Sequence, residues 1–272
     1  GKAIGNGYPI GVVTGSSDVM MANQEAYISS TFFYNSFPMT AALAVMSEEE
    51  SMHSYQYNGS PGVPNFAPRF IQAHVSRTLE GQEIDYLTMP GIKPMLGLVP
   101  LACGCAEHRL TVATTTDPGY PIPADWCGYH PLVNHYAMSL NPENEFRFSP
   151  QDIVGGTALV MMNYPHNPSG QVATENWLLE LCKYCSDHSI RLFNDAAYFV
   201  LSHAAGSRTL SEVAIDFPDL SWAEAFTAAK LIGNGTGWHV GAMVGSPDFI
   251  GDLKVVKGKT DTGFVAPMAA GV

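Results

Sequence analysis

Short apolar segments alternate with segments of helical periodicity along most of this chain, and this alternation restricts its fold more than any other feature. Four apolar runs rich in β-branched residues are expected to be strands, namely Ile84–Met89, Leu110–Thr114, Ala158–Asn163 and Ile190–Asn194. Helices are expected at Arg69–Leu79, Lys93–Glu107 and Thr174–His188. Such alternation predicts a doubly wound α/β domain with a largely parallel sheet, whose ligands gather at the carboxyl ends of the strands.

The composition excludes several classes of partner. The formal net charge is −12, from 13 basic and 25 acidic residues, so binding to a nucleic acid backbone is disfavoured. The sequence contains no continuous apolar stretch of membrane-spanning length and no signal-peptide pattern at its start. Five cysteines, an odd number in a chain of 272 residues, favour reduced thiols and a cytoplasmic location.

The Cys182-x-x-Cys185 pair has two interpretations, a redox or zinc site and a structural role. A zinc site would need a second such pair or histidines at ligand spacing, and the sequence offers neither. Both cysteines fall on the apolar face of a predicted helix, together with Leu178 and Leu181. We therefore expect buried structural cysteines and no bound metal.

Three polar motifs follow one another in the chain and supply complementary chemistry. They are Asn163-Tyr-Pro-His-Asn167-Pro-Ser-Gly170, then Asn194-Asp195-Ala-Ala-Tyr198, then Lys230 with the glycine-rich turn Gly235-Thr-Gly237-Trp-His239. Each alone has an ordinary explanation: a β-turn, a helix cap or a surface lysine. Together they provide an amine, a carboxylate and polar groups, which a pyridoxal phosphate site requires.

The order and spacing of these motifs resemble the class I and II aminotransferases, which belong to the fold-type I pyridoxal phosphate enzymes. The sequence of Asn163–Gly170 is most similar to that of the LL-diaminopimelate aminotransferase branch. The resemblance runs from about Ser54 to the last residue and is faint before it. It implies the three-layer α/β/α large domain of the aspartate aminotransferase type, with pyridoxal phosphate as the cofactor.

The resemblance also implies roles for the residues of the three motifs. Lys230 would form the Schiff base with the cofactor, and Asp195 would face the pyridine nitrogen and keep it protonated. Tyr198 and Asn167 would both bond the phenolic oxygen of the cofactor. Thr227, three residues before the lysine, keeps the hydroxyl that bonds the cofactor phosphate in the family.

Other matches concern the phosphate and the ring of the cofactor. His239 stands where the family has an arginine, after what reads as a one-residue insertion, and a histidine lacks the permanent charge of that arginine. The backbone amides of Ile92 and Lys93 open a helix after a glycine turn and would cradle phosphate. Tyr120 resembles the aromatic residue that stacks on the ring. Tyr57 matches a tyrosine that reaches the phosphate of the neighbouring subunit, which implies a homodimer with shared sites.

The resemblance suggests a division into an N-terminal arm with a partial small domain, residues 1–52, and a cofactor-binding large domain, residues 53–272. It implies that the C-terminal small domain is missing and the chain truncated. We expect an aminotransferase acting on an amino acid and a 2-oxo acid. Two alternatives stay open: a lyase or decarboxylase on the same scaffold, and a non-catalytic relative, which His239 and Ala229 would fit.

Overall fold

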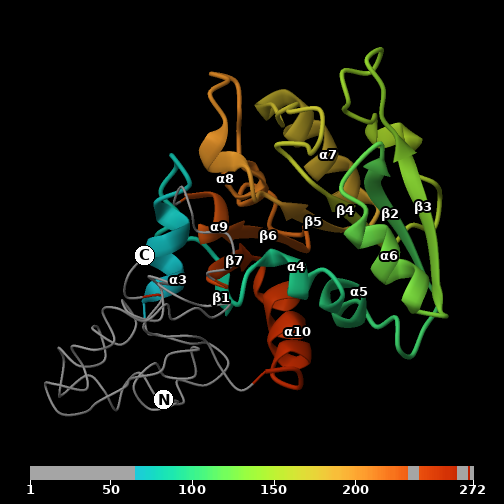
Figure 1. Cartoon of the computed structure of the whole chain (residues 1–272), viewed down its shortest axis with the longest axis horizontal. Coiled ribbons are helices and arrows are strands. Elements are labelled where there is room, and N and C mark those ends of the chain that lie inside the picture. Colours follow the sequence, from blue (N-terminus) through green and yellow to red (C-terminus); the bar gives the residue numbers. More distant parts are fainter. Residues whose placement is uncertain (1–64, 232–238, 262–268, 270–272) are drawn as a thin grey trace, which may run out of the picture. The chain divides into compact units, whose positions relative to one another are not determined.

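A seven-stranded mixed sheet forms the centre of the structure (Figure 1). The computed structural model describes residues 65–231, 239–261 and 269. All of these except residue 269 belong to one compact unit, Gly59–Phe264. The boundary expected between residues 52 and 53 lies outside the described residues, so the division into two domains stays a prediction.

The strands are arranged in the order β1-β7-β6-β5-β4-β2-β3. Their bounds are β1 Asp85–Met89, β2 Leu110–Asp117, β3 Val133–Ser139, β4 Leu159–Met162, β5 Arg191–Asp195, β6 Trp222–Thr227 and β7 Gly241–Gly245. The pairs from β6 to β3 are parallel, whereas β7 is antiparallel to both of its neighbours, β6 and β1. Strand β1 therefore runs in the same direction as β6, and their carboxyl ends meet at one edge of the sheet.

Helices cover both faces of the sheet. They are α3 Phe66–Gln72, α4 Ile92–Met95, α5 Leu98–Ala102, α6 Ile122–Tyr129, α7 Glu175–Asp187, α8 Leu210–Ala214, α9 Ala228–Leu231 and α10 Pro247–Lys257, with 3-10 turns at Pro150–Asp152 and Phe199–Leu201. Figure 1 shows α4, α5 and α10 on one side of the sheet and α7 and α8 on the other. The main core cluster joins apolar side chains of α5 and α10, such as Val99, Phe249 and Leu253, to Leu87 and Phe193 of the strands.

The four predicted strands are confirmed as β1, β2, β4 and β5, and each lies within three residues of the expected limits at both ends. The prediction did not include β3, β6 and β7. Strand β3 lies at an edge and carries polar residues such as Asn134, and β7 is bounded by Gly241 and Gly245, so both lack the continuous β-branched pattern of a central strand.

Two of the three predicted helices differ from the structure. The helix expected at 93–107 is two short helices, α4 and α5, because Pro100 cannot donate a backbone hydrogen bond and Gly104 adopts a positive φ of 84°. The helix expected at 69–79 is α3, which ends at Gln72. Beyond α3, bonds to side chains replace helical backbone bonds: the Gln72 Nε2 donates to the Val75 carbonyl, and the carboxylate of the distant Glu212 accepts the Ser76 N–H.

The third predicted helix is confirmed as α7, and its buried face contains Leu178, Leu181, Cys182 and Cys185. All five cysteines are free. Burial raises the pKa of the Cys185 thiol to about 12, so it is protonated at neutral pH and unreactive as a thiolate. Among the described residues, none of the helices combines the length and the apolarity that crossing a bilayer would take.

Candidate functional site

The strand register brings residues from distant parts of the sequence to one edge of the sheet. Met89, the last residue of β1, pairs with Gly241 of β7, which in turn pairs with Thr227 at the end of β6. Asp195, the last residue of β5, pairs with Ala225 of the same strand β6. The segments that follow β1, β5 and β6 therefore start close together, as expected for ligand-binding loops of an α/β sheet.

A cavity of about 420 Å³ opens at this edge, a size suited to a small organic ligand. Nine of the ten residues predicted for the site line it, namely Ile92, Lys93, Tyr120, Asn167, Asp195, Tyr198, Thr227, Lys230 and His239. The tenth, Tyr57, lies outside the described residues. The sequence prediction therefore selected side chains that the fold brings together from five separate segments.

Lys230 and Tyr198 face each other in the cavity. Lys230 lies in the short helix α9, which continues directly from β6, and its side chain is half-buried. The Lys230 Nζ is 5.4 Å from the centre of the Tyr198 ring. At this distance the electron-rich face of the ring attracts the ammonium group, which restricts where the amine can lie.

Asp195 is the buried carboxylate of the site, with 5% of its surface exposed. Its Oδ1 accepts the N–H of Ala197 at 3.0 Å. Burial raises the pKa of Asp195 from 3.8 to about 6, and the Ala197 bond opposes this rise only partly. A carboxylate in this position is stabilised by any cation that enters the cavity.

Asn167 is held by the segment that precedes it. Its backbone N–H donates to the Asn163 Oδ1 at 3.0 Å, and the Asn163 Nδ2 donates to the Asp195 carbonyl at 2.8 Å. Asn163 also lines the cavity and was not among the predicted site residues. Its position at the start of the Asn163–Gly170 motif, directly after an apolar strand, is the signal that could have identified it.

Some of the lining residues carry the groups expected to meet phosphate. Gly91 has a φ of 90°, a left-handed conformation that glycine adopts readily, and it turns the chain from β1 into α4. The Thr227 hydroxyl accepts the N–H of Ala229 at 3.2 Å and donates to the Val240 carbonyl at 3.4 Å. His239 is exposed and lies two residues before β7, where it reaches the cavity.

Tyr120 follows β2 and also lines the cavity. Burial raises the pKa of the Tyr120 hydroxyl, and the nearby Asp195 adds to this rise, so the phenol is neutral near pH 7. Five further lining residues were not predicted as site residues, namely Pro90, Gly91, Pro94, Ala197 and Ala229. They supply backbone and small apolar groups, for which the sequence gives no chemical signal.

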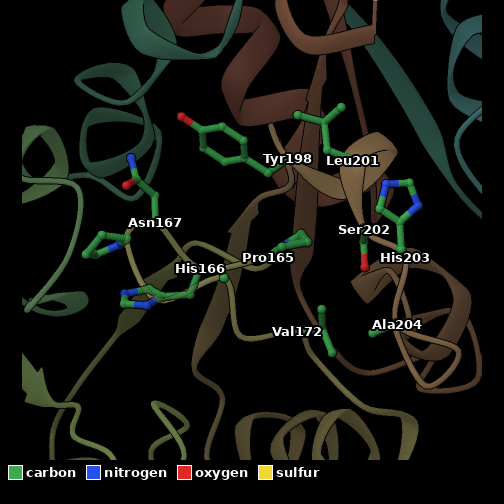
Figure 2. Close-up of a pocket in the computed structure, with 11 residues that line it drawn as sticks. Pro165, His166, Asn167, Val172, Tyr198, Leu201, Ser202, His203 and Ala204 are labelled. Carbon is green, nitrogen blue, oxygen red and sulfur yellow. The ribbon is translucent and has the colours of Figure 1, made fainter.

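A second cavity of about 380 Å³ shares Asn167 and Tyr198 with the first. Figure 2 shows these two residues at one end and His203 and Ala204 at the other. Its lining is largely apolar, with Pro165, Leu201 and Val172 among its members. It lacks an amine or a carboxylate, so the reactive groups lie in the first cavity.

Comparisons with known proteins agree with this geometry. A family model described as Aminotransferase class I and II matches residues 33–270. An LL-diaminopimelate aminotransferase of Dehalococcoides mccartyi is 30% identical over 239 residues, which cover 82% of this chain and 57% of that protein. One of Syntrophobacter fumaroxidans is 29% identical over 249 residues, covering 85% and 60%. The chain thus spans less than two thirds of the length of these relatives.

Solved structures show the same fold. An aminotransferase from Staphylococcus aureus superposes with a TM-score of 0.70 at 21% identity, covering 84% of this chain and 59% of that one. An aminotransferase from Helicobacter pylori gives a TM-score of 0.69 at 16% identity, covering 89% and 63%. The predicted α/β fold of the large domain is therefore confirmed.

Proposed function

This chain belongs to the class I and II aminotransferase family, and from that premise we propose that it forms the cofactor-binding part of an aminotransferase. Pyridoxal phosphate is the cofactor, and the reaction moves an amino group between an amino acid and a 2-oxo acid. One observation carries the proposal: the amine of Lys230 and the buried carboxylate of Asp195 line the same cavity as Asn167 and Tyr198. These are the four kinds of contact that the cofactor ring needs.

The chemistry of the cavity fits each part of pyridoxal phosphate. Asp195, with its raised pKa, is suited to pair with a ring nitrogen that carries a proton. Tyr198 and Asn167 supply donors for the phenolic oxygen, and Tyr120 supplies an aromatic face for the ring. The amides of Ile92 and Lys93, with Thr227 and His239, would hold the phosphate.

When bound, pyridoxal phosphate supplies an aldehyde that condenses with amines and a protonated ring that withdraws electrons from the substrate α-carbon. Lys230 would hold the cofactor until a substrate amine displaces it, and its freed amine would then move the proton at the α-carbon. Tyr198 would orient that amine through its ring. Asp195 would keep the ring nitrogen protonated.

Two further features of the proposal concern the whole protein. Tyr57 supports a homodimer with shared active sites, because its spacing matches the tyrosine that crosses the subunit interface in the family. The partners of the reaction are small molecules, an amino acid and a 2-oxo acid. The five free cysteines support a cytoplasmic location, where thiols stay reduced.

The first experiment tests the cofactor and its lysine. The chain is mixed with pyridoxal phosphate, treated with borohydride and digested, and the labelled peptide is identified by mass spectrometry. We expect the label on Lys230 and its loss in Lys230→Ala. Lys93→Ala is the matched control, because Lys93 lines the same cavity but is proposed to act through its backbone amide. A label that persists in Lys230→Ala and is lost in Lys93→Ala would contradict the assignment.

A second experiment separates transamination from the alternatives. The chain with its cofactor is supplied with an isotope-labelled amino acid and an unlabelled 2-oxo acid, and the products are analysed. Amino-group transfer to the 2-oxo acid supports an aminotransferase. Release of carbon dioxide or of an eliminated side-chain group would identify a decarboxylase or a lyase. Covalent labelling of Lys230 without any product would identify a non-catalytic relative. The family comparisons favour the first outcome.

A further inference from the structure

The ends of strands β4 and β5 are joined by two asparagine side chains instead of further backbone pairing. The parallel ladder between these strands ends with the pair Met162 and Asn194. Beyond it, Asn163 and Asn194 are both buried, with 5% and 1% of their surfaces exposed. Each asparagine bonds the backbone of the opposite segment, but their partners differ in kind.

Asn163 connects two segments of the cofactor cavity. Its Nδ2 donates to the Asp195 carbonyl at 2.8 Å, and its Oδ1 accepts the Asn167 N–H at 3.0 Å. Its own N–H donates to the Thr115 Oγ1 at 3.0 Å. The orientation of the carboxamide is set by its partners, because a carbonyl requires a donor and an N–H requires an acceptor. Only an amide satisfies both at once.

Asn194 instead bonds groups that do not line the cavity. Its Oδ1 accepts the Tyr164 N–H at 2.9 Å, and its Nδ2 donates to the Tyr164 carbonyl at 3.0 Å. The same Nδ2 also donates to the Glu224 carboxylate at 2.8 Å. Asn194 therefore stabilises the fold of the segment, whereas Asn163 lies between Asn167 and Asp195.

We propose that Asn163 is a positioning residue, which fixes Asn167 and Asp195 relative to each other through the two ends of its side-chain amide. The inference rests on the proposed function, in which Asn167 meets the phenolic oxygen of the cofactor and Asp195 meets its ring nitrogen. These atoms are separate points on one rigid ring, so both contacts form together only if the two loops are held at the matching separation. The Asn163 amide sets that separation before the ligand arrives.

Substitutions at Asn163 separate the two hydrogen-bonding functions of its side-chain amide. Asn163→Ala removes both bonds. Asn163→Asp keeps an acceptor for the Asn167 N–H but places a carboxylate oxygen against the Asp195 carbonyl, so only the bond to Asn167 survives. The matched control is Tyr164→Phe in the same segment. It removes the hydrogen bond of the Tyr164 hydroxyl to the Phe146 carbonyl, at 2.6 Å, and leaves both Asn163 bonds in place.

The test uses the full chain with two measurements. Amide hydrogen exchange without cofactor reports on the Asn167 N–H: we expect faster exchange in Asn163→Ala, and near wild-type protection in Asn163→Asp and Tyr164→Phe. Titration with pyridoxal phosphate then gives its Kd and the pH midpoint at which the absorbance of the bound cofactor changes. We expect Asn163→Ala and Asn163→Asp to shift the midpoint and to weaken binding by about tenfold or more.

The outcomes separate this inference from the proposed function. Wild-type binding and midpoint in Asn163→Ala would overturn the positioning role, and so would an equal shift of the midpoint in Tyr164→Phe. A wild-type chain that shows no cofactor binding would overturn the proposed function and the positioning role with it. In that case unchanged exchange at Asn167 in Asn163→Ala would show in addition that the bridge itself is absent.

Discussion

The Lys230 Nζ lies 5.4 Å from the centre of the Tyr198 ring, so Tyr198 can contact both the lysine amine and a bound ligand. Its ring faces the amine, and its hydroxyl is available to the ligand in the same cavity. The two functions can be separated, since Tyr198→Phe keeps the ring beside Lys230 and removes the phenolic oxygen only.

We predict that Tyr198→Phe weakens the binding of pyridoxal phosphate by roughly tenfold, the effect of losing one hydrogen bond to a charged oxygen. Tyr198→Leu should weaken it further, because the amine then also loses the aromatic face, which is worth about 0.5–1 kcal/mol. Equilibrium dialysis of each variant against the cofactor gives the two Kd values. Equal affinities for Tyr198→Phe and the wild type would contradict a contact with the phenolic oxygen.

Asp195 gives a prediction about pH and stability in the cofactor-free chain. The pKa of Asp195 is raised from 3.8 to about 6, so between these values the folded state binds more protons than the unfolded state. The free energy of unfolding therefore falls as pH rises through this window, and the loss is complete above it. The buried charge costs about 2–3 kcal/mol at pH 7.

Asp195→Asn should consequently make the cofactor-free chain more stable at pH 7 while it abolishes tight binding of pyridoxal phosphate. The amide oxygen can still accept the Ala197 N–H, so the local fold is kept. Urea unfolding at pH 7 and at pH 4, where the buried carboxyl is protonated in the wild type, measures the difference. We expect the variant to be more stable at pH 7 and to match the wild type closely at pH 4. A destabilised variant at pH 7 would refute the prediction.

The sequence was sufficient to predict much of the site because its reactive groups are chemically distinctive. Lys230 follows an apolar stretch, and Asp195 ends an apolar strand. A charged side chain is unusual at such positions unless it has a functional partner. Nine predicted residues line one cavity, although their individual roles stay proposals. Tyr57 also stays a prediction, since it lies outside the described residues.

What the sequence did not predict depends on contacts between distant segments. The role inferred for Asn163 requires Asp195, 32 positions later, to lie beside it, which only the β4–β5 register brings about. Similarly, α3 ends early because the Glu212 carboxylate accepts a hydrogen bond from the Ser76 N–H just beyond the helix. Local patterns identify strands and reactive side chains, but tertiary hydrogen bonds decide where helices stop and which amides connect the loops.

His239 gives a prediction about the affinity for phosphate. The family has an arginine at this point, whose planar pair of donors and permanent charge hold a phosphate better than an imidazole does. His239→Arg should therefore tighten the binding of pyridoxal phosphate by roughly tenfold.

The measurement is a titration of each variant with the cofactor, with His239→Ala as the control. That variant should bind more weakly than the wild type, since its side chain has no donor for the phosphate. If His239→Ala bound as tightly as the wild type, the imidazole would have no part in holding the phosphate. Because His239 is exposed and lines the cavity, neither replacement should disturb the fold.

Glu224 connects Asn194 of β5 to the start of helix α8, and its loss should lower the free energy of unfolding. This carboxylate is completely buried on β6 and accepts the Leu210 N–H at 2.9 Å, the Ser211 N–H at 2.8 Å and the Asn194 Nδ2 at 2.8 Å. Glu224→Leu fills a similar volume but leaves three buried donors without an acceptor. We expect a loss of at least about 3 kcal/mol in the free energy of unfolding, from about 1–3 kcal/mol for each unsatisfied group.

Glu224→Gln is the matched variant, because its single amide oxygen still accepts from part of this set. It should cost about half as much as Glu224→Leu, and urea denaturation of the cofactor-free chain measures both. Since Asn194 orients Tyr164 and the loop to Asn167, Glu224→Leu should also weaken cofactor binding, whereas Asp195 itself is untouched. A Glu224→Leu chain as stable as the wild type would mean that these three donors find other partners, and that the buried carboxylate does not hold the loop.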